Sequence, residues 1–254
     1  MDLSDTGKTR REFIAGLLSA PFAGRAFRRL EEEGKLRELL PEVSAMRGVA
    51  QPPEFHPEGD VFEHTMVMLD HMVFPDELLG WSVLLHDVGK PAVRSVEDSG
   101  RIRFFGHEEK GAEMAEEILT RLGVAPEDRA VVVHAVREHM RFASVRMMRP
   151  GKLRALLRAK TFPLELELHR LDCISSHGLL EGFDFLLSSY LALPAPEPPP
   201  LLTGHDLLAL GLPPGPGVGA ILSRIRELRQ KGLITGRDQA LARAEQLAKE
   251  LKLK

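Results

Sequence analysis

The sequence has 254 residues, of which 43% are hydrophobic and 28% are charged, and its formal net charge is -3. This length allows one large hydrophobic core, or one core and a small second domain, and the charge excludes a polycation that coats nucleic acid. A single cysteine, Cys173, excludes a disulfide framework and a cysteine-based zinc site. No apolar run approaches the ~20 residues of a membrane span. We therefore expect a cytoplasmic protein with no membrane association.

The first fifty residues are predicted to form helices that pack on the domain that follows. Residues 9–26 (TRREFIAGLLSAPFAGRA) place two arginines before a short apolar run, as a twin-arginine export signal does. Pro21 interrupts this run, and residues 25–40 (RAFRRLEEEGKLRELL) continue with the spacing of an amphipathic helix. This pattern favours core helices over an export signal.

The rest of the chain is predicted to be helical, apart from one β-hairpin and one linker. Two short β-rich runs flank residues 97–100 (EDSG), which predicts a small hairpin. Residues 194–200 (PAPEPPP) should form a stiff, extended linker. Helical spacing predicts helices within residues 60–73, 76–89, 109–123, 127–140, 151–160 and 164–180, and in a small helical tail over residues 201–254. The prediction is an all-α fold with a domain over residues 51–193.

Nine of the ten histidines lie between His56 and His177, and this clustering favours a metal site. His86 and Asp87 are adjacent at the end of an apolar run, where two polar groups need a common partner. The candidate ligands, each from its own predicted element except for this pair, are His64, His86, Asp87, His107, His139 and Asp172. Mixed imidazole and carboxylate ligands suit Mn, Fe, Co, Ni or Zn, with Mg as an alternative. One bridging carboxylate would allow two ions.

Some histidines have a second interpretation. His134 competes with His139 for one position, and the place of His139 beside Glu138 at a predicted helix end favours His139. His71 is interpreted as a surface residue or as a support for the ligands. Hydrogen-bonding or surface roles are expected for His56, His169 and His177.

The order His64, His86-Asp87, Asp172 resembles the HD superfamily of metal-dependent phosphohydrolases. The segments QPPEFHPEGDVFEHTMVMLD, LLHDVGKP, GRIRFFGHEEKGAEMA, EHMRF and LHRLDCISSHG resemble the HD region of bacterial CCA-adding enzymes and poly(A) polymerases, and LLTGHDLLALGLPPGPGVGAIL resembles their C-terminal segment. Those enzymes carry a catalytic head marked by Gly-Ser and Asp-x-Asp. The present sequence contains neither pattern, and about fifty residues precede the HD region, fewer than a typical domain has. We therefore expect the phosphohydrolase half of the resemblance to apply, without nucleotide addition.

The resemblance implies roles for the candidate residues. His64, His86, Asp87 and Asp172 match the core metal ligands of the family, and His107 and His139 match the ligands of a second ion. Asp87 would bridge the two ions and orient the attacking water. Lys90 matches a lysine near the substrate phosphate, although a solvated lysine at a helix end is an equal alternative. Phosphate binding by Arg94 or Arg141 is a weaker expectation.

We expect a hydrolase that acts on nucleotide or RNA phosphoesters, such as 2′,3′-cyclic or terminal phosphates. The alternatives are an accessory protein that binds RNA or tRNA beside a separate nucleotidyltransferase, and a hydrolase of free deoxynucleotides or cyclic dinucleotides. Residues 141–160 hold seven basic and no acidic side chains, and residues 221–254 hold nine basic and four acidic ones. Both segments could follow a phosphate backbone, or form solvated helix faces. One Trp and one Tyr offer little base stacking. The oligomeric state is left open.

Overall fold

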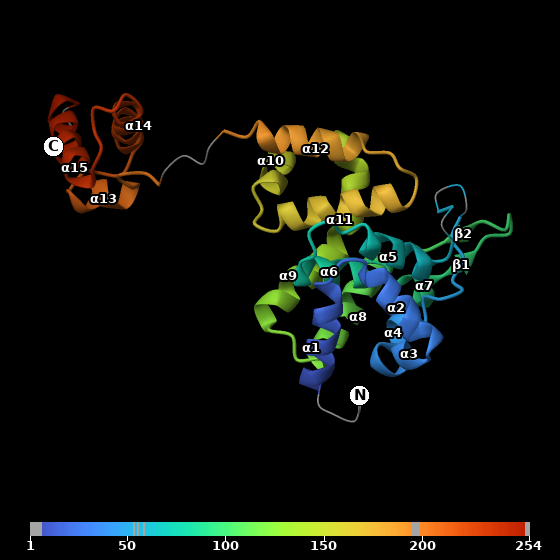
Figure 1. Cartoon of the computed structure of the whole chain (residues 1–254). Helices are drawn as coiled ribbons and strands as arrows, with labels where there is room; N and C mark the ends of the chain where they lie inside the picture. Colours follow the sequence, from blue (N-terminus) through green and yellow to red (C-terminus); the bar gives the residue numbers. More distant parts are fainter. Residues whose placement is uncertain (1–6, 53, 55, 58, 195–198, 252–254) are drawn as a thin grey trace. The chain divides into compact units, whose positions relative to one another are not determined.

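A computed structural model describes residues 7–52, 54, 56–57, 59–194 and 199–251 (Figure 1). The chain divides into two compact units, Met1–Leu193 and Pro194–Lys254. Most of the linker predicted at 194–200 lies outside the described residues. Helices dominate both units, which confirms the all-α prediction. None of the described helices combines the length and the apolar character needed to cross a bilayer.

Four short helices begin the first unit. They are α1 (Gly7–Leu18), α2 (Ala23–Glu32), α3 (Lys35–Leu39) and α4 (Pro41–Ser44). Gly34 separates α2 from α3 with φ 71°, a left-handed conformation that glycine adopts at little cost. Arg28 of α2 donates to Glu63 at 2.8 Å and to Asp70 at 2.7 Å. These ion pairs fix α2 against helix α5 (Val61–Asp70), which carries the candidate ligand His64.

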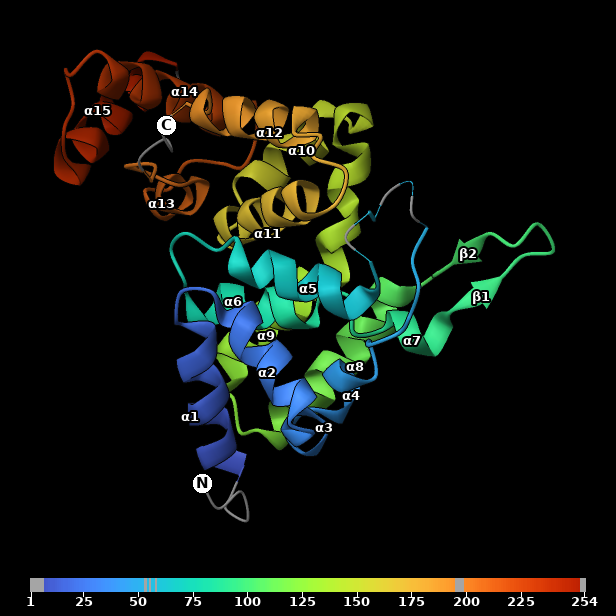
Figure 2. The same cartoon turned by 45° about the vertical axis from the view of Figure 1, so that its right-hand side comes forward.

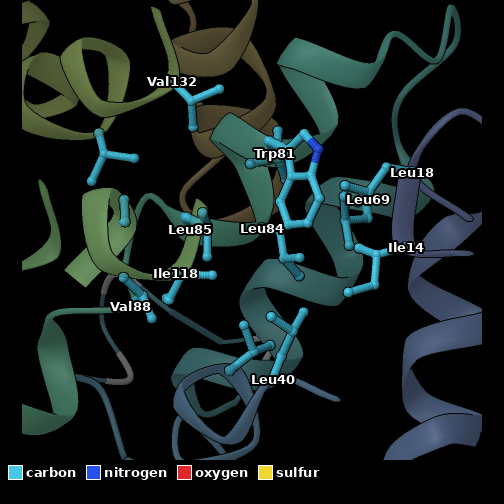
Figure 3. Packing of buried hydrophobic residues seen from close by; sticks show 14 of the residues in the cluster. Ile14, Leu18, Leu40, Leu69, Trp81, Leu84, Leu85, Val88, Ile118 and Val132 are labelled. Atoms are coloured by element: carbon cyan, nitrogen blue, oxygen red, sulfur yellow. The ribbon is translucent and has the colours of Figure 1, made fainter. Parts of the chain in front are cut away.

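The centre of the unit is built around one helix that is apolar on every side. The helices of this region are α5 (Val61–Asp70), α6 (Glu77–Leu85), α7 (Lys90–Val93), α8 (His107–Arg121) and α9 (Pro126–Glu138). Helix α6 is buried along nearly its whole length, as expected for a helix without a polar face. Trp81 and Leu84 of α6 pack among side chains such as Leu18 of α1 and Leu69 of α5 (Figure 3). The His86-Asp87 pair directly follows the buried C-terminal end of α6.

The predicted hairpin is present. Strands β1 (Ser95–Val96) and β2 (Ile102–Arg103) pair antiparallel, with Ser95 opposite Arg103 and Val96 opposite Ile102. Gly100 provides the left-handed residue of the connecting loop, with φ 82°. The hairpin extends away from α7 and α8 into solvent (Figure 2).

The last part of the first unit forms a second layer of helices. It contains a 3₁₀ helix (His139–Met147), α10 (Pro150–Leu157), α11 (Phe162–Ser175) and α12 (Glu181–Leu191). Phe142, Phe162 and Leu186 form the centre of its own apolar cluster. Helix α11 also packs against α5 and α6, and this contact brings Asp172 to the end of the central helix.

The second unit is a small helical domain with its own core. It contains α13 (Gly204–Ala209), α14 (Pro216–Gln230) and α15 (Arg237–Glu250), and its core includes Leu207, Ile221 and Ala244. The side chains of Thr203 and Asp206 cap α13 reciprocally, and Arg237 of α15 pairs with Asp206. These contacts account for a separately packed C-terminal unit.

Candidate metal centre

The six predicted ligands come together where several helices begin or end. His64 lies on α5, and His86 and Asp87 follow the last residue of α6 directly. His107 is the first residue of α8, and His139 is the first residue after α9. Asp172 lies on α11. The sequence placed His86 and Asp87 within a helix that ends at Gly89, whereas α6 ends at Leu85 and the pair occupies the following turn.

The six side chains form two groups that share one carboxylate. Ligand atoms of His64, His86 and Asp87 all lie within 4.8 Å of one another, and so do those of Asp87, His107 and His139. Asp172 joins the first group, because its Oδ1 lies 3.1 Å from Nε2 of His64. Asp87 is therefore the residue that the two groups have in common.

Three of the histidines are held in one tautomer by the backbone. Nδ1 of His86, His107 and His139 lies 2.8, 2.8 and 2.7 Å from the carbonyl oxygen three residues earlier in each case. A carbonyl oxygen only accepts, so Nδ1 must donate its hydrogen and Nε2 of the neutral ring keeps a lone pair. This is the support that metal-binding histidines usually have.

The Nε2 atoms, which carry lone pairs in the neutral rings, lie close to other atoms that carry lone pairs. Nε2 of His107 lies 3.1 Å from Nε2 of His139 and 3.4 Å from Oδ1 of Asp87. Burial lowers the pKa of His139 to about 3, so this ring is neutral at pH 7. Lone pairs that converge without a hydrogen between them repel one another, and a bound cation would remove that repulsion.

Two buried polar atoms of the group make no hydrogen bond among the described residues. They are Nε2 of His86 and Oδ1 of Asp87. An unsatisfied buried polar atom is expensive and usually indicates a missing partner. Burial alone would raise the pKa of Asp87, but nearby positive charge, including the ammonium group of Lys90 at 2.7 Å, outweighs this effect and holds the pKa well below its usual value. The donor set therefore fits divalent cations.

Lys90 is a buried part of this centre. Its Nζ lies 2.7 Å from Oδ2 of Asp87 and donates to Oε1 of Gln51 at 2.7 Å. Only 7% of the residue is exposed, and the ring of Phe104 lies 5.4 Å from its ammonium group. Of the two interpretations of Lys90, the geometry favours the one at the site over a solvated lysine.

The two candidate arginines lie elsewhere. Arg94 is exposed at the end of α7 and does not line the cavity beside the ligands. Arg141 forms ion pairs with Glu138 and with the buried Glu165. His134 also pairs with Glu165, at 3.2 Å, which leaves His139 as the histidine of this region in the ligand group.

A cavity of about 690 Å³ opens beside the ligand groups. Its lining includes residues that the sequence analysis did not select, among them Gln51, Arg101, Arg103 and Phe105. The run RIRFF, which only Gly106 separates from the candidate ligand His107, was the available signal, since it alternates cationic with apolar side chains. Of the remaining histidines, His71 bonds to Ser175 at 3.0 Å, the ring of His56 lies 4.9 Å from that of His64, and His169 and His177 line the cavity.

Comparison with known proteins identifies the domain that holds these groups. Residues 60–173 match the family model of the HD domain. The chain is 34% identical over 255 residues to the A-adding tRNA nucleotidyltransferase of Deinococcus radiodurans, covering 94% of the chain and 58% of the relative. It is 33% identical over 242 residues to the CC-adding tRNA nucleotidyltransferase of Thermus thermophilus, covering 91% and 55%. The Multifunctional CCA protein of Halorhodospira halophila is 39% identical over 143 residues, 56% of the chain and 34% of that protein. The chain thus spans little more than half the length of the first two relatives.

Proposed function

The chain carries an HD domain and is homologous to the HD-bearing part of tRNA nucleotidyltransferases, and from this premise we propose that it is a metal-dependent phosphohydrolase or phosphodiesterase. Its substrates would be nucleotide or RNA phosphoesters with 2′,3′-cyclic or terminal phosphates. The observation that carries the proposal is the pair of ligand groups that share Asp87 beside a cavity. A shared carboxylate is typical of two-ion centres that act on phosphoesters.

The residues divide between two ions. His64, His86, Asp87 and Asp172 would hold the first, and Asp87, His107 and His139 would hold the second. Imidazole-rich sets of this kind suit Mn, Fe, Co, Ni or Zn, with Mg as an alternative. Bound cations would acidify water and neutralise charge on the phosphoryl oxygens.

Asp87 and Lys90 supply the chemistry of the chain itself. Asp87 is kept ionised, so it can orient a water molecule by accepting its hydrogen bond. An ammonium group has three donors, and Lys90 uses two of them on Asp87 and Gln51. The third can donate to a phosphoryl oxygen in the cavity that Lys90 lines. Lys90 would thus position the bridging carboxylate and bind substrate at once.

The test is hydrolysis of 2′,3′-cyclic AMP and of a generic phosphodiester, with Mn²⁺, Ni²⁺, Co²⁺ or Mg²⁺ added. We expect metal-dependent turnover that disappears in Asp87→Ala. Asp184→Ala, on helix α12, is a matched control because Asp184 belongs to neither ligand group. Turnover that survives chelation and Asp87→Ala would contradict the proposal.

RNA binding is a second candidate function. The two relatives that match more than nine tenths of the chain are tRNA nucleotidyltransferases. In addition, residues 141–160 and 221–254 are rich in basic side chains. Binding through phosphates predicts an association with tRNA that weakens steeply with salt and is unaffected by Asp87→Ala. An absent or salt-insensitive interaction would count against this candidate. A panel of free deoxynucleotides and cyclic dinucleotides tests the third alternative.

A further inference from the structure

We propose that residues 101–105, at the end of the hairpin, recognise a nucleoside attached to the phosphate that enters the cavity. Phe105 would stack on the base, and Arg101 would bind a phosphate. This inference rests on the proposed function for its reaction, but base recognition can be measured without turnover. It adds to the proposed function the residues that would bind the base and a phosphate of such a nucleotide.

Phe105 is placed to act as a stacking surface. It lines the cavity, yet 77% of it is exposed. The guanidinium group of Arg103 lies 5.6 Å from the ring centroid, a distance typical of a cation–π contact, and so covers one face. Every nucleobase has a π-face that can pack on an exposed aromatic ring.

The position of Phe105 relative to the metal centre is fixed by the chain. Gly106 follows with φ 75°, and His107 then begins α8 as a candidate ligand. The Nδ1 of His107 donates to the carbonyl oxygen of Phe104 at 2.8 Å. Only Gly106 therefore separates Phe105 from the candidate ligand His107, and the carbonyl group of Phe104 in the same loop sets the orientation of the His107 ring.

Arg101 is the cavity arginine whose charge is left for a ligand. Arg101 directly precedes β2, its carbonyl oxygen accepts from the backbone nitrogen of Glu97 at 2.9 Å, and both Arg101 and Arg103 line the cavity. Arg103 is paired with Glu97 at 2.8 Å, whereas Arg101 is exposed and its guanidinium has no ion pair within the described part of the chain. Lys90 uses two of its three donors on Asp87 and Gln51, which leaves one donor for the first phosphate. Arg101 would bind a second phosphate group of the substrate, or those oxygens of the first phosphate that do not contact Lys90.

The combination favours a nucleotide over a bare phosphate. The cavity, at about 690 Å³, lies within the ~300–1,000 Å³ range of small-molecule sites, and an inorganic phosphate would fill little of it. An aromatic face beside cationic groups is the arrangement with which proteins hold single-stranded nucleotides. A count of Trp and Tyr does not reveal this stacking surface, because its aromatic ring belongs to a phenylalanine.

The test measures binding by equilibrium dialysis, in EDTA so that no turnover occurs. The probes are adenosine 3′-monophosphate and ribose 5-phosphate, which lacks the base. We expect the wild-type chain to prefer the nucleotide, and Phe105→Ala to lose about 5- to 150-fold of affinity for it, with no change for ribose phosphate. Phe74→Ala is the matched control, since Phe74 is 86% exposed and lies outside the cavity lining.

Arg101→Ala should weaken both probes, and Arg37→Ala, an exposed arginine of α3, should weaken neither. Tighter, more salt-sensitive binding of a short oligoribonucleotide with a 3′-phosphate would identify an RNA end as the source of the nucleotide, and equal binding would identify the free nucleotide. A wild-type chain without preference for the nucleotide, or a Phe105→Ala effect on both probes alike, would overturn the inference. If the chain hydrolyses nothing but keeps the preference, only the proposed function fails.

Discussion

Gly89, in the turn after the His86-Asp87 pair, should not tolerate even one methyl group. A Cβ at this position would lie 2.3 Å from the carbonyl oxygen of His107 and 2.5 Å from the backbone nitrogen of Gly111. Both atoms belong to the backbone of α8, so neither can rotate away. The substitution Gly89→Ala must therefore push the turn and α8 apart.

The expected loss follows from this overlap. Overpacking a well-packed core costs about 1–3 kcal/mol, and contacts this short with backbone place Gly89→Ala at the upper end. For a unit of Met1–Leu193, about 3 kcal/mol corresponds to a fall in Tm of roughly 6–12 °C. Because His107 begins α8, the same movement should weaken metal binding by the group of Asp87, His107 and His139.

The matched control is Gly16→Ala in α1, where a Cβ would meet nothing within 4 Å. Alanine is favoured over glycine within a helix by about 1 kcal/mol, so this variant should be slightly more stable than the wild type. Thermal unfolding followed by far-UV circular dichroism measures both changes. A Gly89→Ala variant with the Tm of the wild type would refute the close packing described here.

Three further predictions concern ionisable side chains that are not among the candidate ligands. Glu165→Ala should lower the free energy of unfolding by about 3 kcal/mol, because it leaves the partly buried Arg141 without its buried partner. Urea denaturation measures this loss, and a variant as stable as the wild type would contradict the prediction. Burial opposes ionisation of Glu42, but two hydrogen bonds from Arg121 lower its pKa, so the pair should stabilise the fold by about 0.5–1 kcal/mol above pH ~4.3 and lose this as pH falls through the lowered pKa. A double-mutant cycle at pH 7 and pH 3 measures that coupling, and an equal coupling at both values would contradict it. Burial raises the pKa of Cys173 to about 12, so iodoacetamide at pH 8 should modify the folded chain at least about 100-fold more slowly than the denatured chain, and equal rates would contradict this.

Local patterns in the sequence predicted the hairpin and most of the longer helices, but not α12 or the short helix α7. Apolar spacing identified the segments of α5, α8, α9 and α11, and turn residues identified the hairpin. The end of α6 was misplaced because Val88 continues the apolar pattern, while the backbone already turns after Leu85. Periodicity records which residues are buried, and a buried turn has the same pattern as a buried helix end.

The ligand groups could be anticipated, but their surroundings could not. His86 and Asp87 are adjacent, so their shared burial was visible in the sequence. The partner of Lys90, Gln51, lies 39 residues away, and nothing local indicates the pairing. Arg141 was a weaker candidate for phosphate binding, and its ion pair with Glu165 depends on how α11 packs. Contacts between distant elements decide which charges remain free for a ligand.

The number of divalent ions bound per chain tests the central claim most directly. Mn²⁺ or Ni²⁺ binding can be measured by calorimetry, together with elemental analysis of the dialysed protein. The shared carboxylate predicts two ions for the wild type, one for His107→Ala, and none held tightly by Asp87→Ala. A wild-type chain that binds no divalent ion, or an Asp87→Ala variant that binds as many as the wild type, would contradict the two-ion centre.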